Sequence, residues 1–286
     1  MTSGTKTPAQ ELYHAYMARV YRNEFGVLDP KMHAAVANDW FYCDDRHDQH
    51  FETLRERLPK AKRILDLASG MGSAVLHGLQ QDLDVFGVEP DSEKLALMQA
   101  RINEGIAREG WSPEWKGRFL RAVGESLPFQ DKSFDIVLSY QTLEHVQDSE
   151  AVISEMLRVV RPGGALHLRC PDYSGTFEGH YLLPWLPLLP RSIAKIWLRL
   201  NGRPLLGFEG IRYITKNQIR RLLKKAAGRA GISLTIIDLE QERYEQRLKE
   251  KGVPGWQGPA LPWRVFYYLK RMFRTELQVN LWVTLS

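Results

Sequence analysis

Two acidic residues lie near the ends of apolar runs, on either side of a glycine-rich turn. Asp66 is part of the run ILDL at 64–67, which breaks into the turn ASGMG at 68–72, and Glu89 ends the next run, DVFGVE. Glycines at such a turn let the backbone approach a ligand closely and expose helix N-terminal amides. A carboxylate beside the turn suits an ammonium group, and a second carboxylate suits the hydroxyls of a ribose. The pair therefore predicts a ligand that carries both groups.

A nicotinamide dinucleotide fits this pattern poorly. Its usual glycine spacing, GxGxxG, is not met, because Val75 follows Gly72 at the third position. Asp66 would also place a negative charge beside the phosphates of the dinucleotide. Both features argue against a dehydrogenase.

Alternating strand and helix signals position these residues. Short apolar runs predict buried parallel strands at 64–68, 84–89, 118–123, 134–139 and 164–170, with helices near 72–81, 91–107 and 148–161. The sequence RPGG at 161–164 is a helix stop. This alternation predicts an α/β fold with a doubly wound, mostly parallel sheet and a ligand site at the carboxyl ends of its strands.

The remaining segments predict further elements around this sheet. A basic amphipathic helix is expected at 216–230, and two long strands at 232–240 and 277–286 are expected to pair in antiparallel fashion. Residues 1–60 are expected to be helical and to cover the active site, in front of a main domain at 61–286. Two insertions, at 173–214 and 241–275, are expected on the side where a second substrate would enter.

Charge is divided unevenly along the chain. Residues 171–286 hold 19 Lys and Arg against nine Asp and Glu, a net charge of +10; since the whole chain carries +5, residues 1–170 carry −5. The first ten residues lack the apolar core of a signal peptide, and the two cysteines, Cys43 and Cys170, are expected to be reduced. These features predict a cytoplasmic protein, and aromatic and basic residues in both insertions raise peripheral membrane association as an alternative.

Four segments together resemble class I S-adenosylmethionine-dependent methyltransferases, in particular the small-molecule group that includes the ubiquinone and menaquinone biosynthesis enzymes. The segments are ILDLASGMG, VFGVEPD, AVGESLPFQDKSFDIVLSYQTLEHVQD and MLRVVRPGGALHLRCPDY, within residues 61–173. The resemblance implies a Rossmann-like, seven-stranded sheet with an antiparallel final strand. It also implies S-adenosyl-L-methionine as the methyl donor and S-adenosyl-L-homocysteine as the product.

The resemblance implies a set of cofactor-binding residues around the strand ends. They are Asp66, Ala68, Ser69, Gly70, Gly72, Glu89, Pro90, Gly124, Glu125, Ser126, Tyr140 and Gln141. Two positions depart from the family pattern. Ala68 replaces the first glycine of the turn, and Val123 replaces an aspartate that often binds adenine, so adenine is expected to contact the backbone at 123–125 and the side chain of Leu127.

The methyl group of a sulfonium is already activated, so its transfer depends mainly on positioning, although a hydroxyl acceptor also needs a base. In some small-molecule members of the family, a histidine in the segment after the fourth strand is that base, and His145 occupies this segment. A role for His145 in capping or bracing the helix is the equal alternative. Asp172, Tyr173 and His180 are further catalytic candidates, and no metal site is expected.

These features predict that the methyl acceptor is a small molecule with an apolar part. A lipid-linked or sugar-linked molecule is one form that this acceptor could take. Three alternatives remain at this stage: a nucleic-acid methyltransferase or a protein methyltransferase that uses the basic C-terminal region, and a binding module that keeps the fold without catalysis. The chain lacks the Asn/Asp-Pro-Pro-aromatic motif of amino-methylating members and has SYQT at 139–142 instead. Nucleic acid is therefore not expected as a partner.

Overall fold

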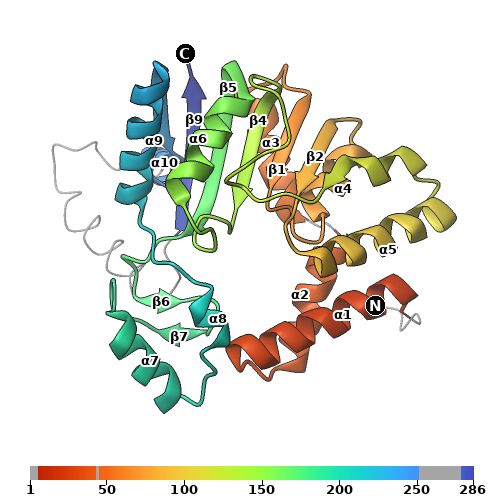
Figure 1. The fold of residues 1–286 in the computed structure, drawn as a ribbon, viewed down its shortest axis with the longest axis vertical. Coiled ribbons are helices and arrows are strands. Elements are labelled where there is room, and N and C mark those ends of the chain that lie inside the picture. Colours follow the sequence, from red (N-terminus) through yellow and green to blue (C-terminus); the bar gives the residue numbers. More distant parts are fainter. Residues whose placement is uncertain (1–5, 43–44, 251–277) are drawn as a thin grey trace.

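A seven-stranded sheet forms the centre of the computed structural model, which describes residues 6–42, 45–250 and 278–286 (Figure 1). Across the sheet the strands are β3 (Phe119–Leu120), β2 (Asp84–Val88), β1 (Arg63–Leu67), β4 (Phe134–Tyr140), β5 (Val160–Pro171), β9 (Gln278–Leu285) and β8 (Leu234–Asp238). Of these, β9 alone runs antiparallel to its neighbours, β5 and β8. The predicted fold class, including the antiparallel final strand, is confirmed.

Helices cover both faces of the sheet. The helices α6 (Ser149–Val159) and α9 (Lys216–Ala230) pack on one face, where Val137 and Leu166 of the sheet meet Ile153 and Leu223. On the other face, α3 (Asp45–Arg57) and α4 (Ser73–Gln80) pack against the sheet through Phe51 and Val75. Further along the chain, α5 (Ser92–Glu109) and the short 3-10 helix η2 (Pro113–Arg118) lead from β2 to β3.

The helix α6 ends two residues earlier than the sequence predicts, at Val159, and β5 begins four residues earlier, at Val160. Asp148 caps the helix by accepting hydrogen bonds from the backbone amides of Glu150 and Ala151. The helix ends at Val159, and Val160 already has extended backbone angles and pairs with Phe134. A proline disfavours helical angles in the residue before it, so Pro162 prevents the helix from continuing through Arg161.

Two groups of elements lie beyond the carboxyl ends of the parallel strands. One is the N-terminal group of α1 (Pro8–Val20), the π-helix η1 (Tyr21–Phe25) and α2 (Pro30–Tyr42). The other is the 173–214 insertion, with β6 (Phe177–Glu178), β7 (Leu183–Pro184), α7 (Arg191–Leu200) and α8 (Leu206–Glu209). Figure 1 shows both groups at the same end of the sheet.

The two groups pack on each other through a shared apolar cluster that includes Phe25, Tyr181 and Phe208. The hydroxyl of Tyr181 lies 2.9 Å from the carbonyl oxygen of Pro204 and accepts a hydrogen bond from the amide of Phe208 at 2.8 Å. Its ring contacts that of Phe25 edge to face, at 5.3 Å between centroids. The insertion and the N-terminal helices therefore form one layer above the sheet edge.

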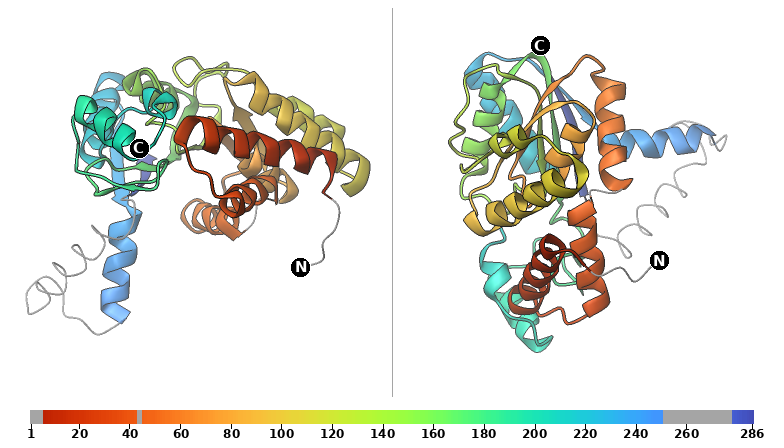
Figure 2. Two further views of the ribbon diagram at one scale, coloured as in Figure 1. Left: turned by 90° about the horizontal axis from the view of Figure 1, so that it is seen from below. Right: turned by 90° about the vertical axis from the view of Figure 1, so that its right-hand side faces the viewer.

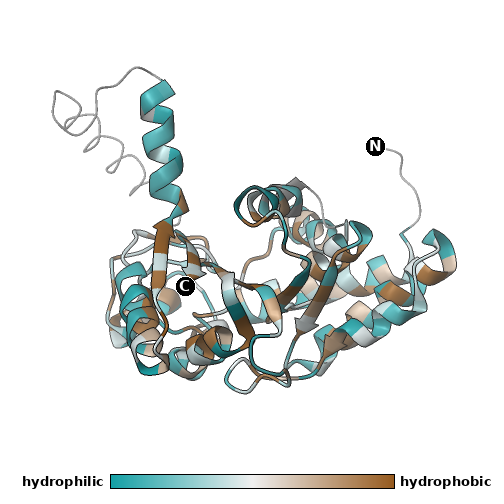
Figure 3. Cartoon of the chain, turned by 90° about the horizontal axis from the view of Figure 1, so that it is seen from above, coloured by the Kyte–Doolittle hydropathy of each residue, from teal (hydrophilic) through white to brown (hydrophobic). Residues whose placement is uncertain are grey.

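The last helix, α10 (Leu239–Glu250), begins where β8 ends and projects away from the rest of the described chain (Figure 2). Its residues are mostly hydrophilic (Figure 3). It is the described part of the insertion predicted at 241–275; residues 251–275, with the aromatic segment at 261–274, lie outside the described residues, as does Cys43. Cys170 is a buried free thiol. Among the described helices, none has the length and apolar character needed to cross a membrane.

Candidate active site

The turn after β1 has a left-handed backbone at three of its five residues. The φ angles are +58° at Ala68, +56° at Gly70 and +81° at Gly72. A Cβ atom at Gly72 would lie 2.7 Å from side-chain atoms of Met98 and Phe119, so no larger residue fits there. Ala68 has a Cβ and still adopts this conformation, which normally favours glycine.

Two buried carboxylates flank this turn, as the sequence predicts. Asp66 is 5% exposed and Glu89 is 2% exposed. Burial raises the pKa of Asp66 to about 7, and the charge of Glu89 acts in the same direction. Glu89 accepts hydrogen bonds from the amides of Gly70 at 2.9 Å and Asp91 at 3.0 Å, which fixes its position beside the turn.

This pair fits a ligand with a cationic amine and two hydroxyl donors. A carboxylate has about four lone-pair sites, so Glu89 keeps accepting capacity after these two amides. An ammonium group would lower the cost of ionising buried Asp66, because an opposite charge favours the ionised form. Ser69 adds a buried hydroxyl that has no hydrogen-bond partner among the described residues. The residues present therefore suit the methionine part and the ribose of S-adenosylmethionine.

The N-terminal helices hold this turn from above. The hydroxyl of Tyr13, on α1, donates a hydrogen bond of 2.9 Å to the carbonyl oxygen of Met71. Trp40, on α2, lies so close to Gly70 that a Cβ there would approach its ring to 2.9 Å. Neither contact was predicted from the sequence, because each partner lies at least 30 residues from the turn.

The cofactor residues predicted at 124–126 lie on a loop that other side chains hold in place. The carboxylate of Glu125 accepts hydrogen bonds from the amides of Gln147 and Asp148, at 3.0 and 3.2 Å. The side chain of Glu125 therefore organises the start of α6. Ser126 and Pro90 are exposed on the surface, and Val123 is 47% exposed.

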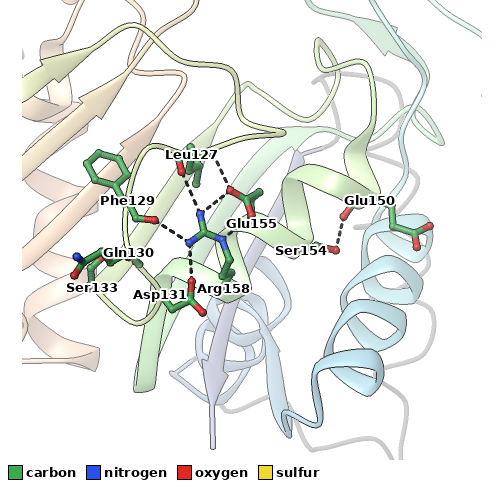
Figure 4. A network of polar contacts seen from close by, with 9 residues as sticks. All are labelled: Leu127, Phe129, Gln130, Asp131, Ser133, Glu150, Ser154, Glu155 and Arg158. Carbon is green, nitrogen blue, oxygen red and sulfur yellow. Dashed lines mark hydrogen bonds and ion pairs between the residues drawn. The ribbon is translucent and has the colours of Figure 1, made fainter.

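The neighbouring segment LPFQD, part of the family resemblance, is anchored by α6 (Figure 4). The guanidinium of Arg158 donates to the carbonyl oxygens of Leu127 and Phe129, at 3.1 and 2.8 Å, and pairs with Asp131 at 2.8 Å. Glu155 accepts from the amide of Leu127 at 2.8 Å, and its hydrogen bond with Arg158 lowers the pKa of its carboxyl. These contacts give the motif a structural role.

Tyr140 is the last residue of β4, and Gln141 follows the strand. The charge of Asp66 contributes to the raised pKa of Tyr140, although burial is the larger cause. The hydroxyl of Tyr140 lies 2.7 Å from Nδ1 of His167, whose own pKa burial lowers to about 3. The side-chain amide of Gln141 donates to Gln278 at 3.1 Å. Both predicted residues lie at the expected edge, with side chains already bonded to the sheet.

Three of the four predicted catalytic residues come together above the strand ends. The rings of His145 and His180 lie 5.4 Å apart, centroid to centroid. Glu178 joins the group: it lies 2.8 Å from Nδ1 of His180 and accepts a hydrogen bond from the hydroxyl of Tyr173 at 3.1 Å. Asp172 does not join it, because its carboxylate accepts from the amide and hydroxyl of Ser174 within a turn.

Sequence reasoning missed Glu178, which is 2% exposed. The only signal available is the spacing Glu-x-His at 178–180, which is common in chains without any such site. The structure gives Glu178 its importance, because β6 and the following turn direct it toward both Tyr173 and His180.

His145 and the glycine turn border the same region. Thr142, three residues before His145, donates a hydrogen bond of 3.2 Å to the carbonyl oxygen of Leu67 at the end of β1. Lys94 lies 3.8 Å from Glu89, and its charge also helps to lower the pKa of His145. Burial is the main cause, with His180 next, and the pKa of His145 falls to about 4. Its imidazole is therefore neutral at pH 7, although 41% of the side chain is exposed to solvent.

The sheet order and the antiparallel β9 define a Rossmann-like domain, with the acid-flanked turn at the carboxyl ends of its strands. Residues 65–168 match the family model described as a methyltransferase domain. This match covers β1 to β5 with both carboxylates, the turn and His145. Residues 65–168 are therefore similar to a methyltransferase domain.

Known proteins are similar to this chain over part of its length. An uncharacterized methyltransferase of Mycobacterium sp. (strain KMS) is 32% identical over 156 residues, which are 54% of this chain and 53% of that protein. The chain thus spans about half the length of the curated relatives that it matches. Among solved structures, the [4+2]-cyclase SpnF is 20% identical, with a TM-score of 0.48 over 83% of this chain and 80% of that one. Phosphoethanolamine N-methyltransferase 2 of Haemonchus contortus is 16% identical, with a TM-score of 0.49 over 99% of this chain and 60% of that one.

Proposed function

We propose that the chain is an S-adenosylmethionine-dependent methyltransferase that acts on a small molecule, as the small-molecule members of the family do. The observation that carries this proposal is the pair of buried carboxylates, Asp66 and Glu89, on either side of the turn in the matched domain. Asp66 would hold the ammonium of the methionine part, and Glu89 the ribose hydroxyls. Bound S-adenosylmethionine supplies an already activated methyl group.

The residues of the chain would then position the acceptor and remove its proton. A hydroxyl acceptor needs a base within hydrogen-bond reach, and the imidazoles of His145 and His180 are suitable groups for this role. The contact with Glu178 orients His180, and Tyr173 in turn holds Glu178. We infer a hydroxyl acceptor from this arrangement, since an amine that is already neutral needs no base.

Calorimetry with S-adenosylhomocysteine tests the cofactor assignment. Glu89→Ala would remove the acceptor of the ribose hydroxyls and should weaken binding by about 1.5–3 kcal/mol, the usual value for a hydrogen bond to a charged group. Glu93→Ala is a matched control, since Glu93 lies four residues further along and is exposed. Equal affinities in the two variants would remove Glu89 from the site.

An apolar acceptor is favoured by the surface of the 173–214 insertion. Of the eleven large hydrophobic side chains exposed among the described residues, seven lie between residues 182 and 206. They are Leu182, Leu186, Leu188, Ile193, Ile196, Leu200 and Leu206. Such a concentration on one segment is typical of an interaction surface.

We infer that α7 contacts a lipid surface from which the acceptor is taken. Ile193, Ile196 and Leu200 are each at least 51% exposed, and Arg199 lies among them on the same helix. This combination suits the boundary of an anionic bilayer. Flotation with anionic liposomes at low salt should therefore recover the protein, and Ile196→Asp with Leu200→Asp should abolish recovery.

Leu12→Asp is the control for this experiment, because Leu12 is 49% exposed on α1 and lies outside the insertion. Recovery should fall as salt screens the headgroups. Absence of flotation of the unaltered chain at low salt would refute the lipid contact and leave a methyltransferase for a soluble acceptor.

A further inference from the structure

Glu144, His145 and His180 bring three metal-ligating side chains together. One ligand atom from each residue lies within 4.8 Å of the corresponding atoms of the other two. Glu144 is fully buried, while His145 is partly exposed, with its Nε2 at 3.9 Å from the Glu144 carboxylate. The cluster thus has a buried carboxylate and a side that is open to solvent.

The hydrogen bonds of the two histidines fix which ring nitrogen carries the proton. Nδ1 of His145 lies 3.3 Å from the carbonyl oxygen of Gly210, which can only accept, so Nδ1 must be the donor. Nδ1 of His180 lies 2.8 Å from Glu178, whose carboxylate also accepts from the amide of Tyr181 at 2.7 Å. In the neutral form of each ring, Nε2 is therefore the nitrogen that carries the lone pair.

This pattern is the one that metal-ligating histidines show in proteins. A ligating histidine usually donates its second ring N–H to a carboxylate or a backbone carbonyl, which fixes the ring and increases its basicity. Here Glu178 serves His180 and the Gly210 carbonyl serves His145. A histidine that only braces a loop needs no such arrangement on two rings at once.

The backbone around the cluster is held in place from three elements. The amide of Arg212 donates to the carbonyl oxygen of Glu144 at 2.7 Å, and the amide of His145 donates to that of Thr142 at 2.8 Å. The ring of Phe25, on η1, stacks on that of His180 at 5.5 Å between centroids. The loop after β4, the 173–214 insertion and the N-terminal group therefore all contribute to the position of the cluster.

We propose that Glu144, His145 and His180 bind a divalent transition-metal ion, with zinc as the best match. Two histidines and one glutamate form a known ligand set of catalytic zinc sites, which keep the fourth position for water or substrate. Two imidazoles disfavour magnesium and calcium, which prefer oxygen ligands. Ligand atoms around tetrahedral zinc lie about 3.3 Å apart, so the side chains would close inward by about 1 Å on binding.

The role of this metal rests on the proposed function, whereas the site itself does not. The cluster lies on the loop that follows β4, beside the end of β1, where the acceptor is expected. An oxygen atom of the acceptor would take the fourth position, and a divalent metal lowers the pKa of an oxygen ligand. With both rings bound to the metal, neither histidine would act as the base; the metal would lower the pKa of the acceptor oxygen, and its proton would pass to water on the side that is open to solvent.

Zinc titration of the chelator-treated full chain tests the site without cofactor or acceptor. Calorimetry should show one zinc ion per chain, and cobalt in its place should give the strong visible absorption of a tetrahedral site. Removal of a ligand in His145→Ala or His180→Ala should abolish stoichiometric zinc binding. Glu178→Gln should weaken zinc binding by about 10–100-fold, the usual effect of changing a residue that hydrogen-bonds a metal-ligating histidine. His14→Ala, which changes a half-buried histidine on α1, should bind zinc like the unaltered chain.

Circular dichroism and thermal melting should accompany each variant, and His180→Asn provides a smaller change should His180→Ala fail to fold. Absence of one-to-one zinc binding by the unaltered chain would overturn the proposal, and so would unchanged binding in a folded His180 variant. S-adenosylhomocysteine affinity, measured on the same preparation, separates the two proposals. Normal affinity without zinc binding would refute the metal site alone, whereas absent affinity would refute the proposed function and leave the zinc result standing.

Discussion

The hydroxyl of Tyr13 donates a hydrogen bond of 2.9 Å to the carbonyl oxygen of Met71, which joins α1 to the glycine turn 58 residues away. Tyr13 is completely buried, and its ring also packs edge to face on Phe41 of α2. The turn that would hold the cofactor is therefore fixed by the N-terminal helices as well as by the sheet. Cofactor binding and the packing of these helices should be coupled.

Tyr13→Phe tests this coupling because it removes the hydrogen bond and keeps the ring. The buried Met71 carbonyl would lose a partner, so the free energy of unfolding should fall by about 1–3 kcal/mol. Affinity for S-adenosylhomocysteine should fall as well. Tyr16→Phe, one turn further along α1, is the control and should change neither quantity; equal effects of both variants would contradict the coupling.

Ala68→Gly should stabilise the protein. The left-handed backbone at Ala68 costs the folded state about 1–2 kcal/mol because alanine has a Cβ, and glycine removes this cost. Glycine also gives the unfolded chain more conformational freedom, which lowers stability by about 0.4–1 kcal/mol. The net gain in the free energy of unfolding should be about 0.5–1 kcal/mol, measured by urea denaturation. Ala74→Gly, in α4, should instead destabilise by about 1 kcal/mol. A loss of stability in both variants would show that Ala68 is not strained.

Cofactor affinity should depend on pH through Asp66. Its pKa of about 7 in the ligand-free protein means that the carboxyl is mostly protonated below pH 7. Binding an ammonium group requires the ionised form, so a proton must be released, and affinity should fall as the pH decreases from 7 to 5, by up to about tenfold per unit. Calorimetry in buffers of different ionisation enthalpy measures this release directly. Asp66→Asn should bind more weakly with no such dependence, and the same slope in that variant would assign the proton to another group.

Arg158 should matter for stability more than for chemistry. Arg158→Ala leaves the carbonyl oxygens of Leu127 and Phe129 without their donor and Glu155 without its cation, at a cost of about 2–3 kcal/mol. Thermal melting should show this loss, whereas Arg108→Ala on α5, an exposed position, should melt like the unaltered chain. A stable Arg158→Ala protein without cofactor affinity would mean that the LPFQD segment acts directly on the ligand.

The regular elements were predictable where local signals agree. The helix predicted at 216–230 is α9 (Lys216–Ala230), because Thr215 and Gln218 form a capping box and Gly231 ends the helix in a left-handed conformation. The strand predicted at 118–123 is shorter, Phe119–Leu120, because at the sheet edge it pairs only with Gly87 and Val88. The apolar character of residues 118–123 could not reveal that only two of them pair with the neighbouring strand, β2.

The candidate site was predictable only where it follows from the rule that ligands bind at the carboxyl ends of parallel strands. Asp66 and Glu89 end adjacent parallel strands, so their convergence follows from the sheet. Glu178 and the pairing of His145 with His180 depend on how the 173–214 insertion folds back over the strand ends, and no periodicity encodes that path. A metal site was not expected from the sequence either, since Glu144 and His145 are adjacent while His180 follows 35 residues after His145, with no recognisable ligand spacing.

A crystal structure of the full chain with S-adenosylhomocysteine tests the central claim most directly. The account predicts the ribose hydroxyls at the Glu89 carboxylate, the amino group at Asp66, and the sulfur atom facing the region bordered by His145 and His180. Ligand density elsewhere, or a bound ligand that leaves Asp66 and Glu89 without contacts to it, would contradict the account.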